Sequence, residues 1–140
     1  MADTLSTEER SRRMALVRST DTGPEMRVRR LLHGMGYRYR LHRRDLPGTP
    51  DLVFPGRRAV VLVHGCFWHR HEGCALARLP KSRKEFWVPK LEGNKARDAR
   101  KVAALQDAGW RVFVVWECET KNLDALAVRL RRFLEGEENQ

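Results

Sequence analysis

DLVFPGRRAVVLVHGCFWHRHEGC, residues 51–74, is the stretch that decides the fold of this 140-residue chain. AVVLV (59–63) is a continuous apolar run, which is typical of a central strand buried on both faces. DLVF (51–54) is a shorter apolar segment, and the PGRR that joins the two has the composition of a tight turn. The stretch therefore predicts two neighbouring strands. Asp51 begins the first and His64 ends the second, so a hairpin would bring these side chains near one another.

The segments on either side alternate between strand and helix patterns. YRYRLH (37–42) alternates apolar with basic residues, as a half-exposed strand does, and RVFVVW (111–116) has the composition of a second buried strand. Helices are expected over 22–36, from after Pro89 to about residue 108, and over 123–134. Trp110 and Trp116 lie in or beside the last strand and are expected in the core. This succession predicts an α/β sandwich with a mixed sheet.

The first twenty residues are expected to form a basic arm. Ser6 and Glu9 form a capping box that opens a helix ending near Arg18, and few of its side chains are apolar. Such a helix is expected to lie on a partner rather than in a core. The length of the chain predicts one domain, 1–140, and a monomer is expected.

The charge balance predicts a polyanionic partner. Lys and Arg number 28 against 18 for Asp and Glu, a formal net charge of +10. Such an excess favours nucleic acid, although a basic protein without such a partner is the alternative. No apolar segment is long enough to span a membrane and the N-terminus lacks a signal-peptide core, so a cytoplasmic protein is expected.

The three cysteines suggest metal ligation, because disulfides are disfavoured in a reducing compartment. Cys66, Cys74 and Cys118 would meet at one end of the sheet if strands 59–63 and 111–116 are neighbours. Zinc takes four nitrogen or sulfur ligands in a tetrahedron, so one histidine must complete the set, and a closed site of this kind is structural. Spacing leaves that histidine open between His69 and His71. Three semi-buried free thiols are the alternative.

Asp51 and the histidines after the second strand suggest hydrolytic chemistry. A carboxylate beside a backbone carbonyl is a common way to hold Mg²⁺, which can polarise a phosphodiester. AVVLV supplies neither the second acid nor the lysine that nucleases of this general architecture usually carry. An imidazole, with an ordinary pKa near 6.5, is the natural substitute for activating water, and His64 and His69 are available. An aspartate that only closes the turn after Pro50 is the alternative.

Five segments together resemble the very short patch repair endonucleases: TPDLVF, HGCFWHRHEGC, EFW (85–87), NKARD (94–98) and GWRVFVVWEC. The resemblance covers about residues 10–134. It implies a restriction-endonuclease-like three-layer sandwich with a structural zinc site. It also implies a Mg²⁺-dependent enzyme that nicks DNA on the 5′ side of the thymine in T·G mismatches, which arise when 5-methylcytosine deaminates. Double-stranded DNA with such a mismatch, and mismatch-repair proteins, are the implied partners of a nucleoid-associated enzyme.

The resemblance also implies a role for each matching position. Asp51 and the backbone carbonyl of Val63 would bind Mg²⁺, His69 would be the general base, His64 would support the metal and its water, and Glu25 and Asp98 would be acidic residues near the active site. Zn²⁺ would take Cys66, His71, Cys74 and Cys118. Phe67, Trp68 and Trp87 would form a wedge inserted beside the mismatch.

The sequence departs from the family pattern at two places. Glu72 and Gly73 put two residues between the zinc histidine and the next cysteine, where the pattern has one. Val63 stands where the family often has a polar residue, which is harmless if only its carbonyl binds metal.

Two other functions remain as alternatives. A zinc-stabilised DNA-binding module without catalysis would share the charge, the zinc and the wedge, and only Asp51 and His69 distinguish it. A restriction endonuclease that cuts both strands of an intact site is disfavoured by the single-domain size.

Overall fold

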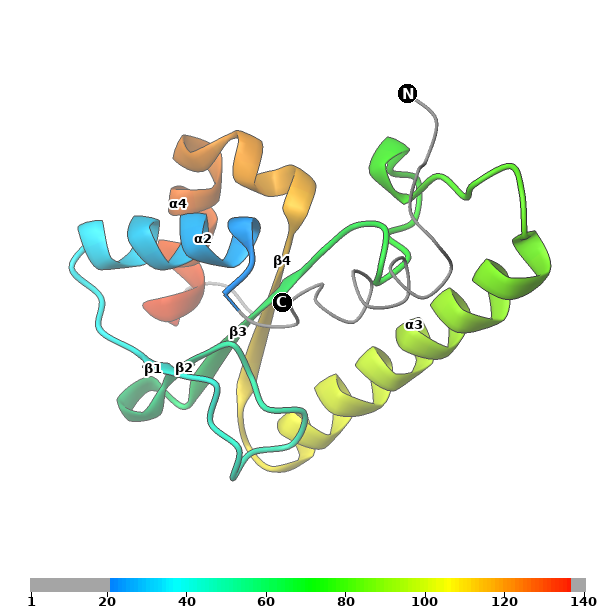
Figure 1. Cartoon of the computed structure of the whole chain (residues 1–140). Coiled ribbons are helices and arrows are strands. Elements are labelled where there is room, and N and C mark those ends of the chain that lie inside the picture. Colours follow the sequence, from blue (N-terminus) through cyan, green and yellow to red (C-terminus); the bar gives the residue numbers. More distant parts are fainter. Residues whose placement is uncertain (1–20, 137–140) are drawn as a thin grey trace.

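The computed structural model describes residues 21–136. The basic arm expected over residues 1–20 lies outside the described residues. Figure 1 shows a central sheet with helices on both of its faces. None of the helices within residues 21–136 has the length and hydropathy needed to cross a membrane.

The sheet has four strands in the order β1 (Arg40–Leu41), β2 (Leu52–Phe54), β3 (Ala59–His64) and β4 (Arg111–Trp116). The first three strands are antiparallel neighbours, whereas β3 and β4 run parallel, so the sheet is mixed as predicted. A short 3₁₀ helix, η1 (Pro55–Arg57), makes the connection between β2 and β3. In the parallel register His64 pairs with Trp116. The start of β2 and the ends of β3 and β4 therefore share one end of the sheet.

Helices complete a three-layer sandwich. Helices α2 (Gly23–Gly34) and α4 (Leu123–Leu134) cover one face through a core that includes Leu32, Phe113 and Phe133. Helix α3 (Lys84–Asp107) covers the other face, where Leu105 and Trp110 pack with β2, β3 and β4. Two further 3₁₀ helices, η2 (Ala75–Ala77) and η3 (Glu117–Lys121), follow β3 and β4 respectively. This architecture confirms the predicted sandwich.

Helix α3 begins earlier than the sequence pattern predicted. It starts at Lys84, so Pro89 lies inside the helix rather than before it. Proline at this position removes the main-chain hydrogen bond that its missing N–H would donate to Glu85, and its ring crowds the carbonyl of that residue. The extra turn brings Trp87 within 5.4 Å of Phe67, measured between ring centroids, and this aromatic packing offsets the lost bond.

The first strand is shorter than predicted. Only Arg40 and Leu41 pair with β2, although the alternating pattern spans 37–42. Tyr37 donates its N–H to the carbonyl of Leu32 and so closes the end of α2 instead of extending the strand. His42 has a left-handed backbone, with φ of 47°, which ends the pairing on the other side.

Candidate functional site

The carboxylate of Asp51 lies directly beside the end of β3. Its Oδ2 accepts a hydrogen bond from the N–H of Val63 at 2.8 Å. Burial raises the pKa of Asp51 to about 7, and the Val63 N–H opposes this shift only in part. A carboxyl whose pKa is raised in this way is stabilised in its charged form by a nearby cation, so the position is compatible with a metal ligand.

Glu25 is a second acid on the Asp51 side of the site. It is 1% exposed, and its negative charge adds to the raised pKa of Asp51. Its carboxylate contacts Nε2 of His42 at 2.9 Å, a guanidinium nitrogen of Arg29 at 3.5 Å and the backbone N–H of Asp21 at 3.2 Å. The sequence pattern placed His42 only at the end of a strand. Its role beside Glu25 arises from the left-handed turn, which no local motif marks.

Two histidines and an aspartate form a second group of polar side chains, which begins at the end of β3. His64 and His69 stack with ring centroids 4.0 Å apart and planes 5° from parallel. Nδ1 of His69 lies 2.5 Å from Oδ2 of Asp98, which projects from the middle of α3. Burial, reinforced by the neighbouring His69, lowers the pKa of His64 to about 4. His64 is therefore neutral at physiological pH, and its Nδ1 is buried with no hydrogen-bond partner among residues 21–136.

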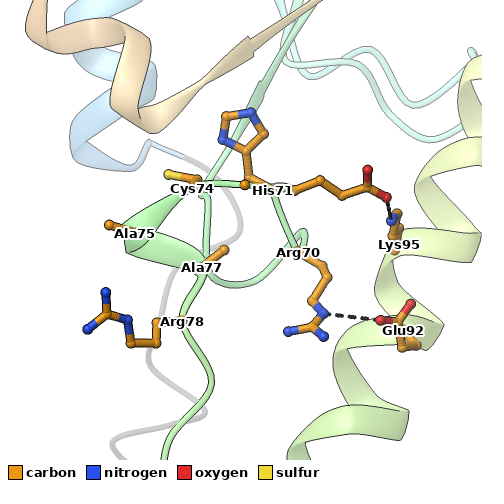
Figure 2. Close-up of a pocket in the computed structure, with 10 residues that line it drawn as sticks. Arg70, His71, Cys74, Ala75, Ala77, Arg78, Glu92 and Lys95 are labelled. Atoms are coloured by element: carbon orange, nitrogen blue, oxygen red, sulfur yellow. Dashed lines mark hydrogen bonds and ion pairs between the residues drawn. The ribbon is translucent and has the colours of Figure 1, made fainter.

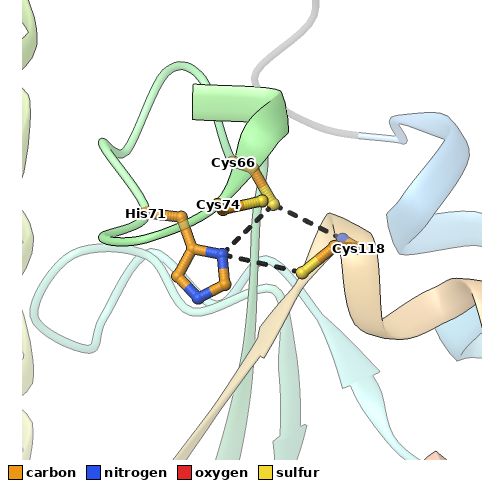
Figure 3. A group of neighbouring side chains, drawn as sticks. All are labelled: Cys66, His71, Cys74 and Cys118. Atoms are coloured by element: carbon orange, nitrogen blue, oxygen red, sulfur yellow. Dashed lines mark hydrogen bonds between the residues drawn. The ribbon is translucent and has the colours of Figure 1, made fainter. Parts of the chain in front are cut away.

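The three thiols and one imidazole converge at the same end of the sheet (Figure 3). Nδ1 of His71 lies 3.5 Å from the sulfur of Cys66 and 3.6 Å from that of Cys118. In a tetrahedral zinc site, Zn–S and Zn–N bonds of ordinary length put sulfur and nitrogen about 3.6 Å apart. Burial raises the pKa of the Cys66 and Cys118 thiols, so without a cation they would stay protonated. The four residues Cys66, His71, Cys74 and Cys118 therefore fit a structural zinc ion.

The two histidines that spacing could not distinguish lie in different places. His71 lies among the thiols, whereas His69 pairs with Asp98. The additional residue before Cys74 is accommodated by Gly73, whose φ of 70° lies in the left-handed region that favours glycine. The cluster is also braced from η3, because the N–H of Cys66 donates to the carboxylate of Glu117 at 3.2 Å.

Aromatic side chains gather where the loop meets α3. The ring centroids of Phe67, Trp68 and Trp87 lie 5.1 to 6.0 Å apart in edge-to-face contacts, and all three rings are half-buried. Phe86 extends the group and is 43% exposed. Asn94 fixes the loop to α3 by donating to the carbonyl of Trp68 at 3.1 Å. These rings are held together at the surface, outside both core clusters.

The two remaining tryptophans lie in different environments. Trp110 is 6% exposed and belongs to the core, as predicted. The same prediction is wrong for Trp116, which is half-buried and stacks on His71 with centroids 4.1 Å apart and planes 8° from parallel. The reason is that Trp116 ends β4, so its ring passes the edge of the core and enters the site.

A pocket of about 640 Å³ lies between the loop at residues 70–75 and α3 (Figure 2). Two ion pairs bridge it, from Arg70 to Glu92 at 3.1 Å and from Lys95 to Glu72. His71 and Cys74 line its wall, so the cluster of three thiols and one imidazole faces solvent on this side. The ion pairs connect the loop to α3, the helix that also carries Asp98.

Known proteins match this chain over most of its length. A model of the DNA mismatch endonuclease Vsr family matches residues 2–76. The type II nicking enzyme V.XorIIP of Xanthomonas oryzae pv. oryzae is 61% identical over 135 residues, covering 96% of this chain and 98% of the relative. The DNA mismatch endonuclease Vsr of Escherichia coli is 41% identical over 142 residues, covering 98% of this chain and 90% of the relative.

A solved structure shares the fold. The catalytic domain of the homing endonuclease I-Bth0305I aligns with a TM-score of 0.58 and 20% identity, over 84% of this chain and 98% of that domain. That likeness shows the fold, and the sequence matches show the family. The chain belongs to the DNA mismatch endonuclease Vsr family and is a nuclease.

Proposed function

We propose that this protein is a Mg²⁺-dependent endonuclease that nicks one DNA strand on the 5′ side of the thymine in a T·G mismatch and so initiates very short patch repair. One observation carries the proposal. The carboxylate of Asp51 lies beside the end of β3, and the loop that follows β3 carries His69, which pairs with Asp98, together with Phe67 and Trp68. The relatives named as a mismatch endonuclease and a nicking enzyme support the same activity.

The Asp51 site fits Mg²⁺. This ion is usually held by one or two carboxylates, keeps several waters and takes phosphate oxygens from the substrate. The N–H of Val63 points to Asp51. In a strand, the N–H and the C=O of one residue point to the same side. The carbonyl of Val63 therefore also faces Asp51's side of β3. When bound, the ion would polarise the phosphodiester and stabilise the leaving oxygen. Asp51 and Val63 would hold it, and Glu25 would add negative charge behind Asp51.

His69 is the proposed general base. Asp98 engages Nδ1 of His69, which leaves Nε2 free to accept a proton from the attacking water. Neutral His64 stacks on this ring and limits its movement without adding a competing positive charge. Asp98 in turn stabilises the imidazolium that forms when the proton arrives.

The aromatic group is the proposed mismatch sensor. Zinc would hold the loop rigid, so that Phe67, Trp68 and Trp87 stay at the surface and enter the base stack. Inserting a side chain costs a few kcal/mol of unstacking, and less at a mismatch, which is a source of selectivity. The net charge of +10 and the basic sequence of residues 1–20, proposed as a DNA-contacting arm, would supply the sequence-independent attraction to phosphate.

The alternatives are less well supported. A DNA-binding module without catalysis does not account for the nuclease family or for the buried Asp51 carboxyl. Cutting of both strands at an intact site leaves the aromatic group without a role. A Mg²⁺-dependent assay on paired and T·G-mismatched duplexes decides the matter. Nicking of the thymine strand of the mismatched duplex alone is expected, and equal cleavage of both duplexes would contradict the proposal.

Trp68→Ala is expected to weaken binding to a T·G duplex by about 1–3 kcal/mol, which is the usual contribution of one base–aromatic stack. Binding to the paired duplex should change much less, because it rests on Lys and Arg contacts to phosphate. Fluorescence anisotropy on both duplexes measures the difference. Leu76→Ala, an exposed apolar side chain beyond the same loop, is the control and should alter neither affinity. Equal losses on both duplexes would show that Trp68 is structural.

His69→Ala is expected to slow nicking by about 10²–10⁴-fold, the range for loss of a general base. Single-turnover rates at saturating Mg²⁺ measure this loss. His33→Ala removes an exposed imidazole at the end of α2 and is the control, which should keep the parent rate. A His69→Ala rate within a factor of three of the parent would assign the base elsewhere.

The Mg²⁺ requirement is expected to rise as the pH falls through 7. A proton on Asp51, whose pKa is about 7, competes with the metal. The half-saturating Mg²⁺ concentration should therefore be about tenfold higher at pH 6 than at pH 8, because one bound proton must be displaced. Nicking rates titrated with Mg²⁺ at both pH values give this ratio. The same half-saturation at both values would remove Asp51 as a ligand.

A further inference from the structure

We propose that Trp116 is a positioning residue for the reaction: it fixes the imidazole of His64, and through it that of His69, against the zinc ligand His71. This inference rests on the proposed function, because it assigns His69 the role of base. Within residues 21–136, the ring contacts of Trp116 are with His64 and His71 and not with the proposed base His69, so it would act through His64.

The parallel register of β3 and β4 creates the contact. His64 and Trp116 are paired residues at the ends of their strands, so their side chains lie on the same face of the sheet. The edge of one ring meets the face of the other, with centroids 5.2 Å apart and planes at 79°. Trp116 also stacks on His71 at 4.1 Å and 8°. One indole ring therefore contacts both the thiol cluster and the histidine pair.

The contacts form a continuous array of side chains. His71 stacks on Trp116, Trp116 meets His64, His64 stacks on His69 at 4.0 Å, and His69 pairs with Asp98 at 2.5 Å. The thiol cluster fixes one end of the array and α3 fixes the other. A ring in the middle of such an array cannot rotate without moving its neighbours, because packed interiors contain few voids.

His64 depends on this packing more than an ordinary buried histidine does. Its Nδ1 has no hydrogen-bond partner within the described part of the chain, so no polar contact there sets the orientation of the ring from that side. Trp116 and His69 are the rings that hold its plane. If the indole is removed, the His64 ring is free to tilt, and the face on which His69 stacks tilts with it. Displacement of a catalytic group by about 1 Å can cost about 10²-fold in rate.

The test compares Trp116→Leu with Trp116→Phe. Leucine is apolar but has no planar ring, whereas phenylalanine has a ring that can stack. Trp116→Leu is expected to lower the single-turnover nicking rate by about 10- to 100-fold, with about one zinc per chain retained. Its affinity for the T·G duplex should stay within a factor of two of the parent affinity. Trp116→Phe should recover the rate to within about threefold. Trp110→Leu, at the opposite end of β4, is the control and should lower the melting temperature without a selective loss of rate.

A double-mutant cycle and an NMR measurement distinguish the positioning of His64 and His69 from a general disturbance of the fold. In a His64→Ala background, Trp116→Leu should change the rate by less than threefold, since the residue through which Trp116 acts is already absent. In ¹H–¹³C spectra, Trp116→Leu should shift the imidazole signals of His64, His69 and His71 and leave that of His33 unchanged. These spectra need no substrate, so they test the packing even if the parent fails to nick T·G duplexes, which would refute only the proposed function.

Three outcomes would overturn the inference: equal rate losses for leucine and phenylalanine, a full additional loss in the His64→Ala background, or unchanged histidine signals. If Trp116→Leu does not fold, the same measurements are made on the Trp116→Phe protein and on its double-mutant cycle with His64→Ala. Rate losses of Trp116→Phe and His64→Ala that simply add would then contradict the inference.

Discussion

Asp51→Asn protein is expected to bind a T·G duplex as well as the parent and to nick it at least about 10³-fold more slowly, since metal polarisation of a phosphodiester contributes several kcal/mol. The substitution keeps the shape of the side chain and its acceptor oxygen for the Val63 N–H, but removes the negative charge that would hold Mg²⁺. Loss of an anion close to phosphate should not weaken association. Single-turnover nicking and anisotropy measured on the same preparation test both halves of this expectation.

The control for this variant is Asp107→Asn, at the end of α3 and far from His64, which should nick at the parent rate. Folding is a second control. The pKa of Asp51 is raised from 3.8 to about 7 in the folded state, so the carboxyl favours folding below pH 3.8 and loses that contribution as the pH rises through 7. Asparagine avoids the cost of a buried charge, so at pH 8 without Mg²⁺ the variant should melt no lower than the parent. Nicking by Asp51→Asn at the parent rate would overturn the catalytic assignment.

Cys118→Ser is expected to lose zinc and more than about 4 kcal/mol of unfolding free energy, in the range seen when a structural metal is lost. Cys118 is the one ligand contributed from beyond β4, so its sulfur closes the site between two distant parts of the chain. Zinc binding at such a site is also folding free energy, because the unfolded chain does not present four ligands together. Metal analysis should give about one zinc per chain for the parent, and chemical denaturation gives the stability difference.

Ala75→Ser is the matched control for this change. It places a hydroxyl at an exposed position next to Cys74 and should alter neither zinc content nor stability by more than about 0.5 kcal/mol. A parent protein that is fully folded after zinc has been removed, or a Cys118→Ser protein that retains one tightly bound zinc, would contradict the structural zinc site.

The sequence alone was sufficient to predict the buried strands. AVVLV and RVFVVW predicted the two strands that became β3 and β4. Each is a short run rich in valine, and such a run favours a strand that is buried on both faces of a sheet. The sequence was less reliable at element ends. Pro89 suggested the start of a helix and instead lies within α3, since packing of Trp87 against the loop outweighs one lost hydrogen bond.

The sequence by itself determined the inventory of the site: which residue types occur, and that they follow strands ending at one edge of a sheet. Spacing left the zinc ligand open between His69 and His71, because both spacings can reach a tetrahedral site, and it was the family resemblance that implied His71. Only the tertiary structure separates the two histidines, by placing Asp98 of α3 against His69 and the sulfur of Cys118 against His71. The role of Trp116 was hidden for the same reason. Its contacts come from the parallel pairing of strands about fifty residues apart, and pairing at that distance is set by the packing of the whole sandwich, not by any local pattern.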